Sequence, residues 1–228
     1  MNFFDDLINR TYDFLSAYQP EINPFDYSWD DIGRNEVILQ RDSAFEMDGI
    51  GFNLITCAEV DEGIAVIGND LNEITANREF ARISIIQIDD IDDEQTAYNT
   101  IRKVEYAKYH FFPKGYMNRN ASDNHREVVR VSKSEIAKGL TFQKAGSLLA
   151  KKYKENSAVK AVKIIYITDK SVDYSALENI AKKNYSITET LNHVMNNINF
   201  DCSVCNLKPI CDEVEGMREL HFKNSGKM

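Results

Sequence analysis

The stretch that decides the fold spans residues 139–167 and has the sequence GLTFQKAGSLLAKKYKENSAVKAVKIIYI. Its first half places apolar side chains at helical spacing on one face: Phe142, Ala145, Leu148, Leu149 and Tyr153. Its last part, residues 161–167, is a short apolar run of the kind that forms strands. Consecutive Ile164 and Ile165 require cover on both faces of a sheet, so we expect an interior strand rather than an edge strand.

Other short apolar runs upstream of this unit are also typical of strands. They cover residues 37–39, 52–56, 64–67, 82–88 and 128–131, and turn signals such as Asp48-Gly49 lie between them. Residues 113–124 are expected to form a polar loop. Because helical segments alternate with these strands, the sequence predicts an α/β fold, a mixed sheet with helices packed on it.

Helical periodicity predicts helices over residues 2–17, 93–109, 173–183 and 187–196. Capping-box patterns beginning at Ser132 and Ser186 predict a helical turn after Ser132 and the start of the last helix. The first helix should pack on the α/β domain or on a partner chain through Phe3, Phe4, Leu7 and Ile8.

The pattern divides the chain into three parts. Residues 1–35 form an N-terminal helix and arm, residues 36–200 form the α/β domain, and residues 201–228 form a small cysteine-rich, metal-binding segment. Trp29 lies in the arm and is expected to plug onto the main domain.

Composition excludes several classes of protein. The 228 residues carry a net charge of −9, which argues against a nucleic-acid binder because such proteins need a basic face. No apolar run approaches the ~20 residues of a membrane span. The start, MNFFDDLINR, lacks the basic and apolar regions of a signal peptide. We therefore expect a cytoplasmic protein that binds neither nucleic acid nor membrane.

Three of the four cysteines lie within ten residues near the end of the sequence. Cys202, Cys205 and Cys211 form a C-x2-C-x5-C pattern, and His221 follows as a candidate fourth ligand. In a reducing compartment such a cluster favours a metal site over disulfides. The alternative is three unligated thiols in a flexible tail. Three cysteines with one histidine suit zinc, because iron–sulfur clusters normally take four cysteines.

Other candidate residues carry weaker signals. His110 and His125 flank a basic polar loop that could bind an anion, although scattered loop charges are usually solvated. His193 is expected to be structural, and Cys57 to be a small buried apolar residue in a strand. The sequence has no glycine-rich phosphate loop, no serine nucleophile elbow and no His-x-x-x-His helix, so no catalytic residue is predicted.

Residues 129–154, VRVSKSEIAKGLTFQKAGSLLAKKYK, resemble the central part of acetyl-CoA synthase, the beta-subunit type of the carbon monoxide dehydrogenase/acetyl-CoA synthase complex. Residues 51–54 (GFNL), residues 64–74 (IAVIGNDLNEI) and the strand at residues 83–88 also resemble this family. The resemblance extends over about residues 45–222. It implies an α/β middle domain followed by a cluster-binding segment.

The resemblance also implies a role for the cysteines. By position, Cys202, Cys205 and Cys211 resemble the first three ligands of the family's four-iron cluster, and Cys205 resembles the one that bridges to nickel. The family's fourth cysteine falls at His221. The resemblance therefore favours an iron–sulfur (4Fe-4S) cluster over zinc as the cofactor, with zinc as the alternative.

The sequence departs from the family in three respects. It has no downstream C-x-C pair for the distal nickel, it lacks most of the large N-terminal region, and residues 115–124 contain no tryptophan. We therefore expect no nickel and no complete acetyl-CoA synthesis by this chain alone.

Three hypotheses for function follow. The first is an accessory protein of one-carbon or corrinoid metabolism that binds one metal centre and serves in electron transfer or in docking to a corrinoid or CO dehydrogenase-type protein. The second is a subunit of a split CO dehydrogenase/acetyl-CoA synthase. The third is a zinc-stabilised interaction module.

Overall fold

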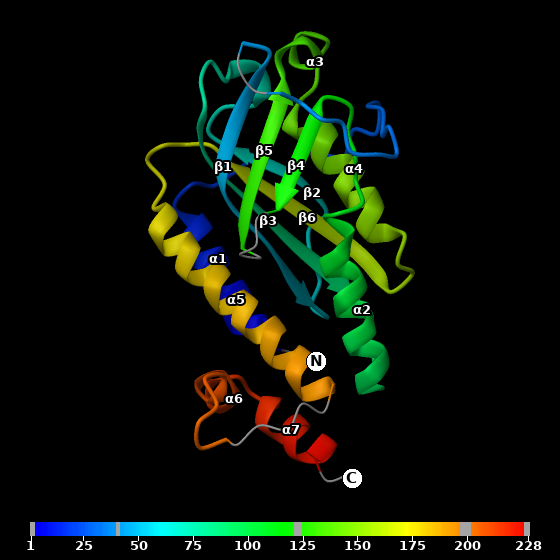
Figure 1. Ribbon diagram of the computed structural model, residues 1–228, viewed down its shortest axis with the longest axis vertical. Helices are drawn as coiled ribbons and strands as arrows, with labels where there is room; N and C mark the ends of the chain where they lie inside the picture. The colour runs from blue at the N-terminus through cyan, green and yellow to red at the C-terminus, as the bar shows by residue number, and fades with distance from the viewer. Residues whose placement is uncertain (1–2, 40–41, 121–124, 197–201, 226–228) are drawn as a thin grey trace.

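The protein is built on one six-stranded mixed sheet (Figure 1). The computed structural model describes residues 3–39, 42–120, 125–196 and 202–225. The strands are β1 (Ala44–Thr56), β2 (Gly63–Ile67), β3 (Arg78–Ile88), β4 (Tyr116–Asn120), β5 (Arg126–Ser132) and β6 (Val159–Ile167). Their order is β2-β6-β3-β1-β5-β4. The β1–β3 and β2–β6 pairs are parallel and the others antiparallel. The predicted mixed α/β sheet is confirmed.

Helices cover both faces of the sheet. They are α1 (Asp5–Ser16), the 3₁₀ turn η1 (Leu71–Glu73), α2 (Glu94–Ala107), α3 (Lys133–Ala137), α4 (Phe142–Lys154), α5 (Tyr174–Met195), α6 (Lys208–Glu213) and α7 (Met217–Ser225). On β1, Asn53 accepts a hydrogen bond from Tyr153 of α4, whereas Thr56 donates one to Asp5 of α1. Residues 53 and 56 of a strand point to opposite faces, so α4 and α1 lie on opposite sides. Helix α5 packs beside α1 (Figure 1).

Strand β6 is the interior strand that the sequence predicts. It lies between β2 and β3, and residues 162–167 are all buried. The first helix also packs as predicted, because Phe3, Phe4, Leu7 and Ile8 are all buried in the main hydrophobic core. Trp29 is half-buried against the same core and donates its indole N–H to the Lys114 carbonyl at 2.9 Å.

The prediction for the region before residue 52 was wrong in two ways. Residues 37–39 form no strand, and Val37 and Leu39 are exposed. Instead β1 begins at Ala44 and runs straight through Asp48-Gly49, which we expected to be a turn. Gly49 serves close strand packing, because a Cβ there would lie 1.8 Å from the Phe80 carbonyl oxygen. A glycine that admits a neighbouring backbone looks like a turn glycine in the sequence.

Two further elements differ from expectation. Part of the predicted polar loop is strand β4, an edge strand paired with β5; residues 121–124 of that loop lie outside the described residues. The two helices predicted around residue 185 are the single helix α5. Ser186 does not cap a new helix; its hydroxyl donates to the Lys182 carbonyl at 3.0 Å, a common contact within a helix. Ser132 precedes α3 as predicted, but its side chain makes no capping hydrogen bond.

The core is shared between all three predicted parts of the chain. Buried side chains of α1, the sheet and α7 belong to one hydrophobic cluster, which includes Leu7, Met217 and Leu220. The arm pairs with the edge strand β2 through a bridge between Asn23 and Ile64. The division into three domains stays a prediction. Within the part of the chain that the structure describes, no helix is long and apolar enough to cross a membrane.

Candidate functional site

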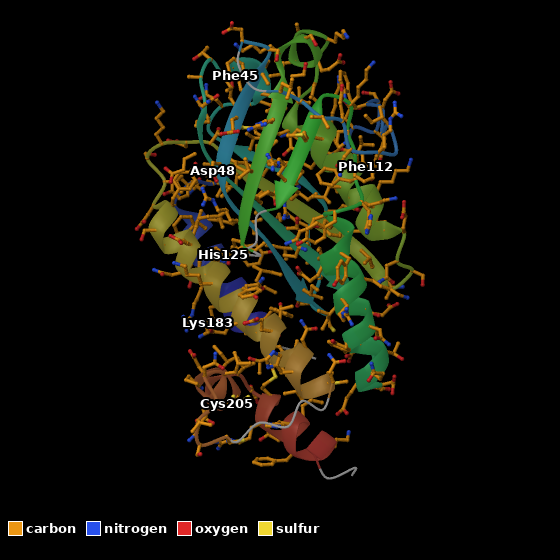
Figure 2. The ribbon with its side chains drawn as sticks, viewed as in Figure 1. Phe45, Asp48, Phe112, His125, Lys183 and Cys205 are labelled. Atoms are coloured by element: carbon orange, nitrogen blue, oxygen red, sulfur yellow. The ribbon has the colours of Figure 1, made fainter. Side chains whose placement is uncertain are left out.

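The cysteine-rich segment folds against the end of α5 (Figure 2). Cys202 is exposed, while Cys205 and Cys211 are half-buried. Cys205 lies in the turn before α6 and Cys211 lies on α6, which Pro209 opens in its first turn. Proline suits that position because its missing N–H would have no partner inside the helix. All three cysteines are free thiols.

The three thiols lie close enough to interact electrostatically. Burial raises the pKa of the Cys211 thiol, and Cys205 and Cys202 raise it further. Such mutual repulsion between thiolates is what a bound cation removes. Among the described residues, however, no three His, Cys, Asp or Glu side chains already stand in a metal-binding arrangement. The candidate ligands are gathered in one segment but not assembled into a coordination sphere.

The fourth candidate ligand comes from the neighbouring helix. His221 lies half-buried on α7, and its ring is nearly parallel to that of Phe222, with the two centroids 6.1 Å apart. Buried Leu207, Met217 and Leu220 fasten the segment to the rest of the protein.

Ion pairs add to this attachment. Lys183 of α5 pairs with Glu213 of α6, and Lys223 of α7 pairs with Glu94 of α2 at 2.8 Å.

The chemistry of the donor set, three neighbouring thiols and an imidazole, fits a zinc ion or an iron–sulfur cluster.

A second polar site lies inside the sheet and was missed by the sequence analysis. Arg82 on β3 and Glu127 on β5 are both fully buried and form a two-pronged ion pair, with Nη2–Oε2 2.8 Å and Nε–Oε2 2.9 Å. Arg82 also donates to Asn53 at 3.0 Å and to Ser84 at 2.7 Å. Burial alone would lower the pKa of Arg82, but Glu127 raises it above its usual value, so the guanidinium stays charged.

Glycine on the intervening strand makes this pair possible. Arg82 and Glu127 approach across β1, which lies between β3 and β5. A Cβ on Gly51 would lie 1.9 Å from Glu127 Oε2. Gly51 therefore leaves the space through which the carboxylate reaches Arg82.

Tyrosines surround the buried pair. Tyr153 donates to Asn53 at 2.8 Å, and burial raises its pKa to about 12. Tyr116 and Tyr166 are buried close to each other and to the ion pair. Burial raises the pKa of both tyrosines, so they stay neutral at ordinary pH.

A cavity of about 160 Å³ opens between α2 and α5, beside this cluster. Glu105 of α2 and Lys108, the residue that follows α2, line one side, and Asn184 of α5 lines the other. Burial raises the pKa of Glu105, while Lys108 and Arg82 partly oppose the rise. Burial lowers the pKa of Lys108, and Glu105 opposes that fall. Pairs of groups shifted toward neutrality in a cavity are a signature of functional sites.

The structure separates the histidines that sequence analysis considered together. His110 is exposed and lies in an open hollow near Phe112, whereas His125 lines the 160 Å³ cavity. His193 is half-buried on α5. Cys57 follows the end of β1 rather than lying within it, and is half-buried rather than buried.

The missed residues did leave a signal. Arg82 lies in the run ARISIIQI and Glu127 lies in REVVRV. The alternation of each strand places these charged side chains at positions that face the core. Two opposite charges at inward strand positions predict a buried pair. Pairing Arg82 with Glu127 also requires the order of the strands in the sheet, which the sequence alone does not give.

The fold defines an α/β protein with a helix-covered mixed sheet and a thiol-rich C-terminal segment. Residues 30–172, more than half of the chain, match the model of the CO dehydrogenase/acetyl-CoA synthase complex beta subunit, and the chain belongs to this family. The predicted family resemblance is thereby confirmed. No curated protein matches the chain.

Proposed function

We propose that this protein is an accessory member of its family that binds one metal centre through Cys202, Cys205, Cys211 and His221. The observation that carries the proposal is the gathering of three interacting thiols in one segment of a chain that belongs to the family of the CO dehydrogenase/acetyl-CoA synthase complex beta subunit. An iron–sulfur cluster held there would supply one-electron transfer. The thiolates and the imidazole would hold it, and α5 would fasten the segment to the α/β domain.

We further propose that the protein docks to a CO dehydrogenase-type or corrinoid protein. The family description names a subunit of a complex, which supports a protein partner. Residues 1–228 contain no C-x-C pair, so we expect no nickel bound within them and no acetyl-CoA formation by this chain alone.

A zinc-stabilised module is the second candidate, and His221 is the observation that favours it. Zinc accepts three thiolates and one imidazole, whereas iron–sulfur clusters normally take four cysteines. In that case the metal would stabilise the segment without redox chemistry.

The decisive experiment is metal analysis of protein made without oxygen. We expect iron with a brown absorbance for the cluster, or one zinc per chain and no colour for the zinc module. Cys205→Ala should release the metal, because it removes one of the three thiols of the segment, whereas Cys57→Ala, the matched cysteine control, should retain it. His221→Cys should retain or strengthen an iron–sulfur cluster by completing the all-cysteine set.

Three results would overturn the proposal: a metal-free wild type, metal retained by Cys205→Ala, or equal loss in Cys57→Ala. Nickel near one per chain together with acetyl-CoA formation would overturn the accessory role.

A further inference from the structure

The cavity between α2 and α5 contains a lysine that the metal proposal does not use. Lys108 is only 4% exposed, and it lines this cavity of about 160 Å³. Buried lysines are rare, because an ammonium group loses its hydration inside a protein. Tyr106 and Tyr109, which are 52% and 37% exposed, line the same cavity, so it opens to solvent on their side. A small molecule can therefore reach Lys108 from outside.

Charged groups from α2 and from two strands act on Lys108. Glu105 precedes it by three residues, so the two lie on the same face at the end of α2. Arg82 of β3 and Glu127 of β5 act on it from the sheet. The Lys108 Nζ also lies 5.3 Å from the centroid of the Tyr109 ring. Lys108 is thus an interacting member of the buried polar cluster.

Burial shifts the two neighbouring groups of α2 in opposite directions. It lowers the pKa of Lys108; Glu105 opposes that fall and Arg82 adds to it. It raises the pKa of Glu105, and Lys108 and Arg82 partly oppose that rise. Both shifts favour an amine beside a carboxylic acid. A desolvated lysine next to another cation is a typical nucleophile, and a neutral carboxyl group can donate a proton to a reacting group.

These two groups suit the addition of an amine to a carbonyl compound. The Lys108 nitrogen forms a bond to the carbonyl carbon, and the bond from that carbon to its oxygen breaks. The oxygen leaves as water, with one proton from the amine and one from Glu105. The products are an iminium cation at Lys108 and a carboxylate at Glu105, and nothing is oxidised or reduced. Because the new charges are opposite and adjacent, neither is buried without a partner.

The opposite side of the cavity adds a requirement for a hydrogen-bond donor. Asn184 is 4% exposed, and its buried Oδ1 has no hydrogen-bond partner among the described residues. Buried acceptors normally have a donor, and a hydroxyl group on the ligand would supply one. The volume restricts the ligand's size, because engineered cavities of about 150 Å³ hold benzene, a molecule of six non-hydrogen atoms.

We propose that Lys108 forms a Schiff base with a small ketone or aldehyde that carries a hydroxyl group beside its carbonyl. Glu105 donates the proton that completes the leaving water, and Asn184 Oδ1 accepts a hydrogen bond from the ligand hydroxyl. No comparison assigns a ligand to these residues. The reaction involves no cysteine, so it does not depend on the metal centre.

Reductive trapping tests the proposal on the full chain. The protein is incubated at pH 7 with hydroxyacetone and cyanoborohydride, which reduces a Schiff base to a stable amine, and each lysine is then examined by peptide mass spectrometry. Lys108 should acquire at least about tenfold more label than Lys103, an exposed lysine of α2 that does not line this cavity. Acetone, which lacks only the hydroxyl group, should label Lys108 at least about tenfold more slowly.

Two variants test the assigned partners. Glu105→Gln keeps the shape of the side chain but removes the proton, so it should slow labelling of Lys108 at least about tenfold, with Lys103 as the internal control. Asn184→Leu should bring hydroxyacetone and acetone to nearly equal rates. Circular dichroism checks that each variant folds; if Asn184→Leu does not, the comparison of the two ketones on the wild type carries that test.

Three results would overturn the proposal. Labelling of Lys108 no faster than that of Lys103 would leave Lys108 as a structural partner of Glu105 only. Unchanged labelling in Glu105→Gln would exclude Glu105 as the proton donor. Equal rates for hydroxyacetone and acetone on the wild type would exclude the contact with Asn184.

Discussion

Replacing Arg82 by methionine should be one of the most damaging single changes in this protein. The substitution leaves the Glu127 carboxylate fully buried without its cation, and Asn53 and Ser84 lose the donor that contacts them at 3.0 and 2.7 Å. Breaking a buried ion pair from one side typically costs about 3–5 kcal/mol. That is a large share of the roughly 5–15 kcal/mol by which domains are stable.

A double variant distinguishes the effect of the buried charges from the effect of the volume that the two side chains fill. With Arg82→Met and Glu127→Leu together, neither charge remains, and similar volumes of apolar side chain take their places. Replacing both partners by apolar groups is often nearly neutral. We therefore expect the double variant to be more stable than Arg82→Met alone, with a coupling of about 2–3 kcal/mol between the two positions.

Urea unfolding followed by circular dichroism and by the fluorescence of Trp29 measures these free energies. Urea is uncharged and does not screen the pair, unlike guanidinium chloride. Arg126→Met is the matched control, because Arg126 is the neighbour of Glu127 on β5 and its partner Asp48 is exposed. Exposed pairs contribute about 0–1 kcal/mol. Additive effects of the two core substitutions, or equal losses in Arg82→Met and Arg126→Met, would refute the assigned role of the buried pair.

The remaining predictions concern the same region. Gly51→Ala should destabilise the protein by about 1–3 kcal/mol, because its methyl group would displace Glu127. In a Glu127→Ala background, Gly51→Ala should lower the free energy of unfolding by much less. An equal loss in both backgrounds would show that Gly51 does not serve to make room for Glu127. The pKa of Glu105 is raised in the folded protein, so the unfolded chain binds fewer protons at this residue. The contribution of Glu105 to stability therefore falls as the pH rises above 4.5, the ordinary pKa of a glutamate. Glu105→Gln should therefore gain stability relative to wild type between pH 4.5 and pH 7 in urea titrations, and a constant difference across that range would contradict the shift.

The parts of the fold that were predicted correctly are those where local spacing carries the information. The helical face of α4 and the apolar run of β6 need only neighbours in sequence to be recognised. The first half of β1 was missed because its glycines are required by contacts with residues distant in sequence. Gly49 leaves room for the Phe80 carbonyl, and Gly51 leaves room for the Glu127 carboxylate. Nothing within residues 44–51 distinguishes such glycines from those of a turn.

The candidate sites divide in the same way. The cysteine pattern was found from spacing, because C-x2-C-x5-C is a local feature. The cavity could not be found, since Glu105 and Asn184 are 79 residues apart in the sequence and meet only when α2 and α5 pack near the sheet. Its clearest feature, an unpaired Asn184 oxygen, exists only in the folded chain.

Family membership and the cysteine ligands rest on separate parts of the chain. The matched residues end at 172, before α5 begins at Tyr174, whereas all three clustered cysteines follow α5. Membership is therefore carried by the sheet with α2, α3 and α4, and it does not by itself establish a cluster at Cys202, Cys205 and Cys211. Helix α5 joins the two parts, because Lys183 pairs with Glu213 in the cysteine segment. Metal analysis thus tests a property that the family match leaves open, and a metal-free result would remove the proposed centre while leaving the family assignment intact.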